Sequence, residues 1–102
     1  AITKPAGKLK PASIRFTRDL RTGDKGEDVR ALQKFLNSNG FLVAKSGPGS
    51  PGNETTLFGA GTRAAIRLYQ EAYAKNILAP QGLKRGNGLF GPSTRNFTNS
   101  IK

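Results

Sequence analysis

The sequence predicts an all-α fold: a three-helix bundle with long Gly/Pro-rich connecting loops and a basic N-terminal arm. Apolar residues recur at helical spacing in three stretches, 24–39, 60–76 and 92–101. A heptapeptide, Leu-Phe-Gly-x-x-Thr-Arg, occurs at 57–63 and again at 89–95. Because units this small cannot bury an apolar face alone, we expect the two copies to pack on each other or on the first helix.

The N-terminal region differs in composition from the rest of the chain. Residues 1–13 combine prolines and lysines with few apolar side chains, which is typical of a linker. We therefore expect residues 1–17 to form a basic flexible arm and residues 18–102 to form one domain. Residues 14–18 alternate in polarity, which permits a short extended segment. Leu20 is then expected to enter the core before a turn at Gly23.

The first helix has signals at both ends. Asp24 can cap it, with Glu27 at a spacing that permits reciprocal capping. Its apolar stripe includes Leu32 and Leu36. Gly40 stands where a left-handed residue commonly ends a helix. After it, the prolines and glycines of residues 47–55 exclude a helix or a central strand. This segment is either a functional loop or a surface insertion.

Each heptapeptide predicts the same corner. We expect a buried Leu-Phe pair, a glycine at the N-cap, and a helix that begins with Thr-Arg. Gly59 and Gly91 fit the N-cap position, and Pro92 stands at the first helical position, where proline is best tolerated. The core is expected to unite the apolar side chains of all three helices: Leu32, Leu36, Phe58, Ile66, Tyr69, Phe90 and Phe97.

Composition restricts the chemistry. The chain has 102 residues and a formal charge of +11, with neither cysteine nor histidine. Thiol chemistry, disulfides and the usual zinc ligands are therefore excluded. Four of the six acidic residues lie at or just before the first helix, where capping and the helix dipole explain them. We expect no catalytic residues, no metal site and no cofactor. No apolar run is long enough to span a membrane, and we expect no signal peptide in residues 1–20.

The positive charge predicts an anionic partner: nucleic acid, acidic lipid or an anionic polymer such as a bacterial cell wall. A merely solubilising charge is the alternative. Nucleic-acid binding usually needs exposed aromatic side chains among the basic ones. The aromatic residues here fall on predicted core faces, so nucleic acid is the weaker hypothesis.

Three motifs occur in a characteristic order: G-x-x-G-x-x-V-x-x-L-Q-x-x-L at 23–36, Phe58-Gly59-x-x-Thr62 with Tyr69-Gln70, and Gly88-x-Phe90-Gly91-x-x-Thr94. Over about 18–102 the sequence resembles the peptidoglycan-binding-domain-like family of bacterial and phage cell-wall proteins. The resemblance implies a three-helix, non-catalytic module with a wall-binding groove beside the glycine corners. It also implies an extracellular or cell-envelope location.

The candidate ligand-binding residues follow the repeated corners: Arg63, Arg95, Thr62, Thr94, Gly59, Gly91 and Arg67. The arginines are the stronger candidates, because the core does not explain them. For the threonines, the glycines and the stripe-edge residues Gln33 and Gln70, a structural role is the favoured interpretation. The function predicted is peptidoglycan binding that anchors or targets a protein to the envelope. The alternatives are an electrostatic binder of nucleic acid or anionic polymer, and a structural module of an envelope assembly.

Overall fold

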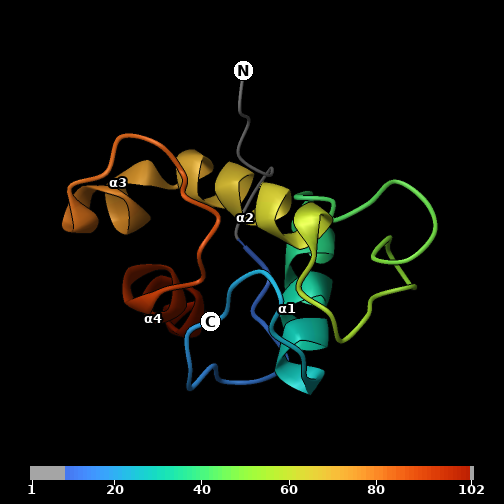
Figure 1. Ribbon diagram of the computed structural model, residues 1–102. Helices are drawn as coiled ribbons and strands as arrows, with labels where there is room; N and C mark the ends of the chain where they lie inside the picture. The colour runs from blue at the N-terminus through green and yellow to red at the C-terminus, as the bar shows by residue number, and fades with distance from the viewer. Residues whose placement is uncertain (1–8, 102) are drawn as a thin grey trace.

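The computed structural model describes residues 9–101, and three longer helices form its frame (Figure 1). They are α1 (Glu27–Ser38), α2 (Ala60–Ala72) and α4 (Pro92–Ser100). A four-residue helix, α3 (Ala74–Ile77), and a 3-10 turn (Ala79–Gln81) follow α2. The all-α prediction is confirmed: within residues 9–101 the extended backbone pairs only at two isolated bridges, Leu20 with Phe90 and Lys25 with Leu57.

The first helix is shorter than expected at its start. It begins at Glu27 with Gly26 as N-cap and no side-chain cap, so the capping role predicted for Asp24 is wrong. The Asp24 carboxylate instead accepts the amide of Arg21, 3.0 Å away, in the preceding turn. The other end is as predicted. Gly40 has φ of +88°, and the amide of Phe41 donates to the carbonyl of Leu36 at 2.9 Å, a Schellman motif.

The second helix ends earlier than the predicted 60–76. Tyr73 leaves helical geometry at φ −118° and ψ 43°, and the chain then turns into α3. The ring of Tyr73 packs between those of Phe41 and Phe97, with centroids 6.4 and 5.5 Å away. Aromatic packing at this residue therefore accompanies a break that the apolar periodicity alone does not reveal.

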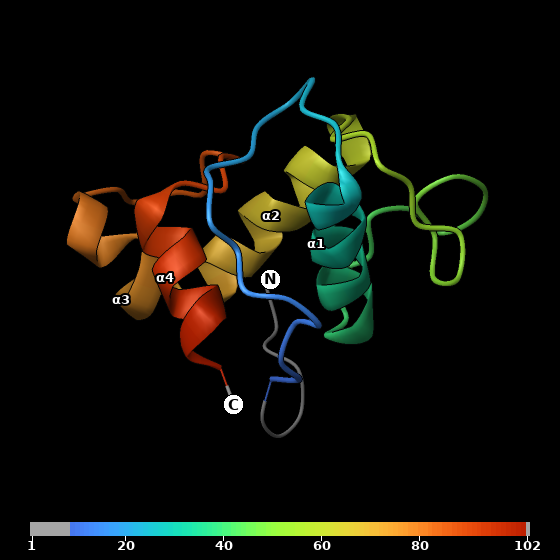
Figure 2. The ribbon, with the colours of Figure 1, turned by 90° about the horizontal axis from the view of Figure 1, so that it is seen from below.

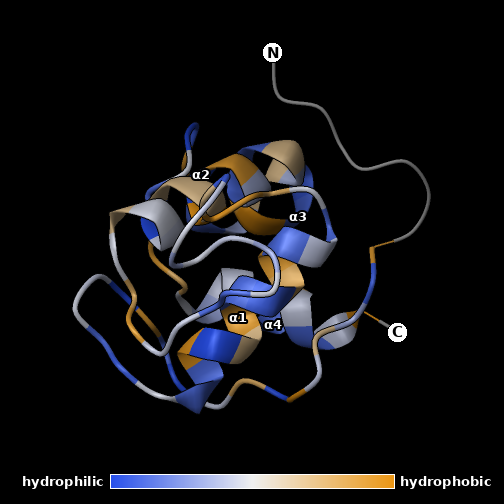
Figure 3. Cartoon of the chain, turned by 90° about the vertical axis from the view of Figure 1, so that its right-hand side faces the viewer, coloured by the Kyte–Doolittle hydropathy of each residue, from blue (hydrophilic) through white to orange (hydrophobic). Residues whose placement is uncertain are grey.

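One continuous core joins the helices, and all seven predicted residues belong to it, with Phe97 partly buried at its edge. Tyr69 lies at the centre, with its hydroxyl 2.9 Å from that of Thr98. Burial raises the pKa of the Tyr69 phenol far above its ordinary value. In Figure 3, orange hydrophobic and blue hydrophilic residues alternate along the helices, as expected of helices that bury one face.

Part of the expected arm, residues 9–17, packs on the domain. Residues 1–8 lie outside the described part, but Leu9 and Phe16 are buried. The side chain of Asn39 exchanges hydrogen bonds with the backbone of Lys10, and that of Asn99 does so with Phe16, at 2.7–3.0 Å. These two asparagine clasps tie residues 9–17 to the domain. The alternation that places Phe16 inward is visible in the sequence, but the clasps are not.

Candidate functional site

Two buried glutamines organise the repeated corners. Gln33 of α1 donates to the hydroxyl of Thr62 at 3.0 Å and to the carbonyl of Leu57 at 2.9 Å, and accepts the amide of Thr55. Its side chain thus fixes the end of the first loop against the start of α2. The expectation that this glutamine satisfies buried backbone is confirmed.

Gln70 of α2 repeats the arrangement at the second corner. It donates to the hydroxyl of Thr94 at 3.0 Å and to the carbonyl of Leu89 at 2.8 Å. It accepts the amides of Asn87 and Gly88 at 2.9 and 3.1 Å. The heptapeptide repeat in the sequence is therefore a repeat of one hydrogen-bonded corner.

A strap of backbone, residues 20–26, connects the two corners. Leu20 and Phe90 exchange two backbone hydrogen bonds of 3.0 and 2.9 Å. Farther along, the amide of Gly23 donates to Phe58, and Phe58 donates back to Asp24, both at 2.9 Å. The strap holds the corners on one side of the domain. Figure 2 shows this side at its top, where α1, α2 and α4 all begin.

The strap and the second corner enclose a groove of about 520 Å³. Its lining includes Arg21 and Asp24 from the strap, and Leu89, Gly91 and Pro92 from the corner. A smaller hollow of about 300 Å³ lies at the first corner, where Pro48 and Gly49 of the long loop form part of its wall. We call the larger one the corner groove.

The expected burial of both Leu-Phe pairs is only half right. Phe58 and Phe90 are fully buried, but Leu57 and Leu89 are 48% and 45% exposed. Successive side chains of an extended segment point to opposite sides, so a buried phenylalanine sends the preceding leucine outward. Leu89 therefore offers the corner groove an apolar surface.

Gly59 and Gly91 are the N-caps of α2 and α4, as predicted, but no steric constraint in the described structure requires glycine at either position. Their φ angles are −107° and −92°, in the extended region open to any residue. A Cβ at either position would meet no atom within 4 Å. The expectation that they are backbone necessities is therefore wrong. Gly88 differs, because its φ is +77° and a Cβ there would collide with the side chain of Arg63.

The three candidate arginines have different surroundings. Arg95 pairs with Asp19 at 2.6 Å and ties α4 to the residue just before the strap. Arg63 is exposed and lies against Gly88, between the groove-lining residues Asn87 and Leu89. Arg67 is exposed on the outer side of α2, with Gly86 against its backbone. The structure does not gather these guanidinium groups at one point.

The candidate threonines face inward. Thr62 and Thr94 are 1% and 0% exposed. The Thr62 hydroxyl accepts a hydrogen bond from Gln33, and the Thr94 hydroxyl accepts one from Gln70. Sequence reasoning missed Arg21 and Leu89 as groove residues. The alternation of side chains along the extended segment could have predicted that Leu89 points outward. No sequence pattern indicates that Leu20 pairs with Phe90 and so places Arg21 in the groove.

A second ion pair fixes the base of the strap. Arg18 donates to both carboxylate oxygens of Asp28, at 2.8 and 3.1 Å. The hydrogen bond from this guanidinium holds the pKa of Asp28 below its usual value. Across residues 9–101, acidic side chains form no cluster able to hold a metal ion. Over the same residues, no helix is long and apolar enough to cross a membrane.

Comparisons with known proteins agree with this architecture. The family described as "Putative peptidoglycan binding domain" matches residues 25–77. Among solved structures, the N-terminal domain of SleB is similar, with 30% sequence identity and a TM-score of 0.58. That likeness covers 83% of this chain and 93% of the SleB domain. No curated protein matches the chain.

Proposed function

Because the chain belongs to the peptidoglycan-binding domain family, a family of non-catalytic binding modules, we propose that it holds peptidoglycan in the corner groove. The proposal places the bound segment between the strap and the second corner. Recognition is non-covalent. An extracellular or cell-envelope role, in which the module anchors or targets a protein to the wall, is part of the same proposal.

Gly91 carries the proposal. Nothing within the described structure requires glycine there, since its backbone is ordinary and its Cβ position is open. A residue without a side chain at the rim of a groove lets a ligand approach the backbone closely. Gly91 also begins α4, whose N-terminal dipole favours a negative group. The carboxylates of peptidoglycan stem peptides are such groups.

Neighbouring side chains suit the same ligand. Arg21 is exposed in the lining and can form a charge-assisted fork with a carboxylate. Leu89 supplies apolar contact, and Arg63 at Gly88 extends the basic border. Arg95 serves here as a positioning residue through its pair with Asp19. Thr62 and Thr94 are assigned structural roles, because their hydroxyls face Gln33 and Gln70.

The test adds a side chain at the rim without disturbing the fold. Serine is a preferred N-cap, so Gly91→Ser should melt within a few degrees of the parent. Its binding to insoluble peptidoglycan, measured by co-sedimentation, should fall about tenfold or more, because even one lost charge-assisted contact is worth about 1.5–3 kcal/mol. Gly59→Ser is the matched control at the first corner.

The two variants discriminate between the corners. Loss of binding in Gly91→Ser alone supports the corner groove. Parent-like binding by a folded Gly91→Ser would exclude this groove as the site. Loss in Gly59→Ser alone would move the site to the first corner.

A further inference from the structure

Three of the six acidic side chains form ion pairs and the other three accept hydrogen bonds from neutral groups, so most of the basic side chains have no ion-pair partner among residues 9–101. Ion pairs or hydrogen bonds engage each acid: Asp19 with Arg95, Asp24 with the Arg21 amide, Glu27 with Arg30, Asp28 with Arg18, Glu54 with Asn37, and Glu71 with the Gly86 amide. The exposed cations outside these three ion pairs are therefore available to an anionic partner.

Gly86 and Gly88 allow the loop that carries some of these cations to lie close to α2. The loop after α3 crosses the outer side of α2 closely, so that a Cβ on Gly86 would lie 2.6 Å from the Arg67 carbonyl oxygen. The Glu71 carboxylate accepts the Gly86 amide at 2.9 Å and fixes the loop there. Because Lys84 and Arg85 directly precede Gly86, this contact leads their backbone past that of Arg67, beside the Glu71 carboxylate. We call the exposed side chains of Arg67, Lys84 and Arg85 the basic ridge.

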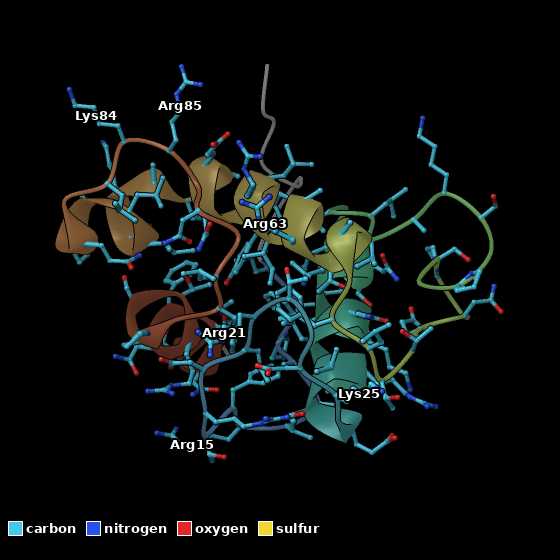
Figure 4. All side chains as sticks on the ribbon, viewed as in Figure 1. Arg15, Arg21, Lys25, Arg63, Lys84 and Arg85 are labelled. Atoms are coloured by element: carbon cyan, nitrogen blue, oxygen red, sulfur yellow. The ribbon has the colours of Figure 1, made fainter. Side chains whose placement is uncertain are left out.

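The loop that carries Lys84 and Arg85 lies along α2. Gly88 lies against Arg63 and Gly86 against Arg67, so the loop follows α2 in the opposite direction. Arg63 and Arg67 are one helical turn apart, about 6 Å along the axis. Lys84 and Arg85 precede Gly86 in the chain, on the side of Gly86 away from Gly88. Figure 4 shows both at the outer edge of the domain, pointing away from it, with Arg63 nearer the middle of α2.

We propose that the basic ridge binds a linear phosphodiester polymer associated with the cell wall. Several exposed cations in one region attract a polymer that carries a negative charge on every repeat unit more strongly than a small molecule with a single charge. Guanidinium forks match phosphate oxygens, and a lysine adds a point charge. The choice of a wall polymer relies on the family's peptidoglycan function but not on the corner groove.

Nucleic acid carries the same phosphodiester chemistry but fits the ridge less well. Single-stranded nucleic acids gain affinity by stacking bases on exposed aromatic side chains. Within residues 9–101 no aromatic side chain is exposed: Tyr73 and Phe97 are partly buried and the others fully so. A polyol phosphate polymer has neutral, non-aromatic linkers between its phosphates, so it can bind without aromatic side chains on the protein.

The experiment uses the full 102-residue chain and fluorescently labelled poly(glycerol phosphate), with affinity measured by anisotropy over a range of salt concentrations. The logarithm of the association constant should fall linearly with the logarithm of salt concentration. In Lys84→Gln/Arg85→Gln, the slope should decrease by about 0.7 for each cation removed. Arg67→Gln, which removes one cation, should decrease the slope by about 0.7.

A matched control removes the same formal charge elsewhere. Lys34 and Lys45 are exposed on α1 and in the long loop, so Lys34→Gln/Lys45→Gln should keep the parent's slope. Equal losses in both double variants would overturn the ridge in favour of net charge. Tighter binding of an oligo(dT) strand than of poly(glycerol phosphate), at equal phosphate concentration, would overturn the choice of polymer.

Failure of this proposal is distinguishable from failure of the groove. Peptidoglycan stripped of attached phosphate polymers should bind Lys84→Gln/Arg85→Gln as it binds the parent. Gly91→Ser should retain the parent's affinity for poly(glycerol phosphate). If Gly91→Ser instead weakens polymer binding as much as the ridge variant does, the two surfaces are one site and the ridge proposal is wrong.

Discussion

Replacing Gln70 by methionine tests the hydrogen-bonded corner most directly. Methionine has a similar length and no branch, so the cavity term stays small. What is lost is the set of bonds to the amides of Asn87 and Gly88, the carbonyl of Leu89 and the hydroxyl of Thr94. Gln70 itself is fully buried.

The cost follows from the groups left without partners. Each buried backbone group that loses its hydrogen bond costs about 1–3 kcal/mol. Three backbone groups lose a bond here, so we expect a loss of about 3 kcal/mol after some rescue by water at the loop. For a domain of this size, 1 kcal/mol shifts the melting temperature by about 4–8 °C. Gln70→Met should therefore melt at least about 12 °C below the parent.

The measurement is reversible thermal unfolding followed by circular dichroism, with urea unfolding as a second estimate of the free energy. Gln81 provides the control, because it is exposed and donates one bond to the carbonyl of Ile77. Gln81→Met should change the free energy of unfolding by less than about 1 kcal/mol. If Gln70→Met is no less stable than Gln81→Met, the glutamine does not hold the corner.

Three further outcomes are expected. Phe90→Ala should cost about 3–5 kcal/mol in chemical unfolding, since the ring is fully buried; a melting curve like the parent's would contradict its place in the core. The lowered pKa of Asp28 adds stability that is present above about pH 4 and is lost as the pH falls through the folded-state pKa. Asp28→Asn should thus flatten the acid side of the stability profile, and an unchanged profile would show that Arg18 does not stabilise this carboxylate. Arg63→Lys keeps the charge but not the fork, so peptidoglycan binding should weaken; equal binding in co-sedimentation would limit Arg63 to a general electrostatic contribution.

The fold was largely predictable because its determinants are local. The stripes that bury Leu32 and Leu36, the glycine that ends α1, and the repeated corners are all written in short stretches of sequence. The helix break at Tyr73 and the clasp at Asn39 depend on partners far along the chain. Local patterns carry no information about such pairings.

The candidate site was less predictable for the same reason. The two corner glycines were found from their repetition, but their open Cβ positions appear only in three dimensions. Arg21 enters the groove because Leu20 pairs with Phe90 across the fold. Arg63 and Arg95 occupy equivalent positions in the repeat, so the sequence made them equally strong candidates for ligand binding. In the structure only Arg95 of the two pairs with a carboxylate, that of Asp19.

The two corner units share α2, which supplies Thr62 to one and Gln70 to the other. The first unit pairs Gln33 with Thr62 and the second pairs Gln70 with Thr94, so the first pair ends and the second begins within α2. A single cut of the chain can therefore leave an intact α2 with only one of the two units. Half-length fragments should remain unfolded alone, and the module should be inherited, transferred or lost only as a whole.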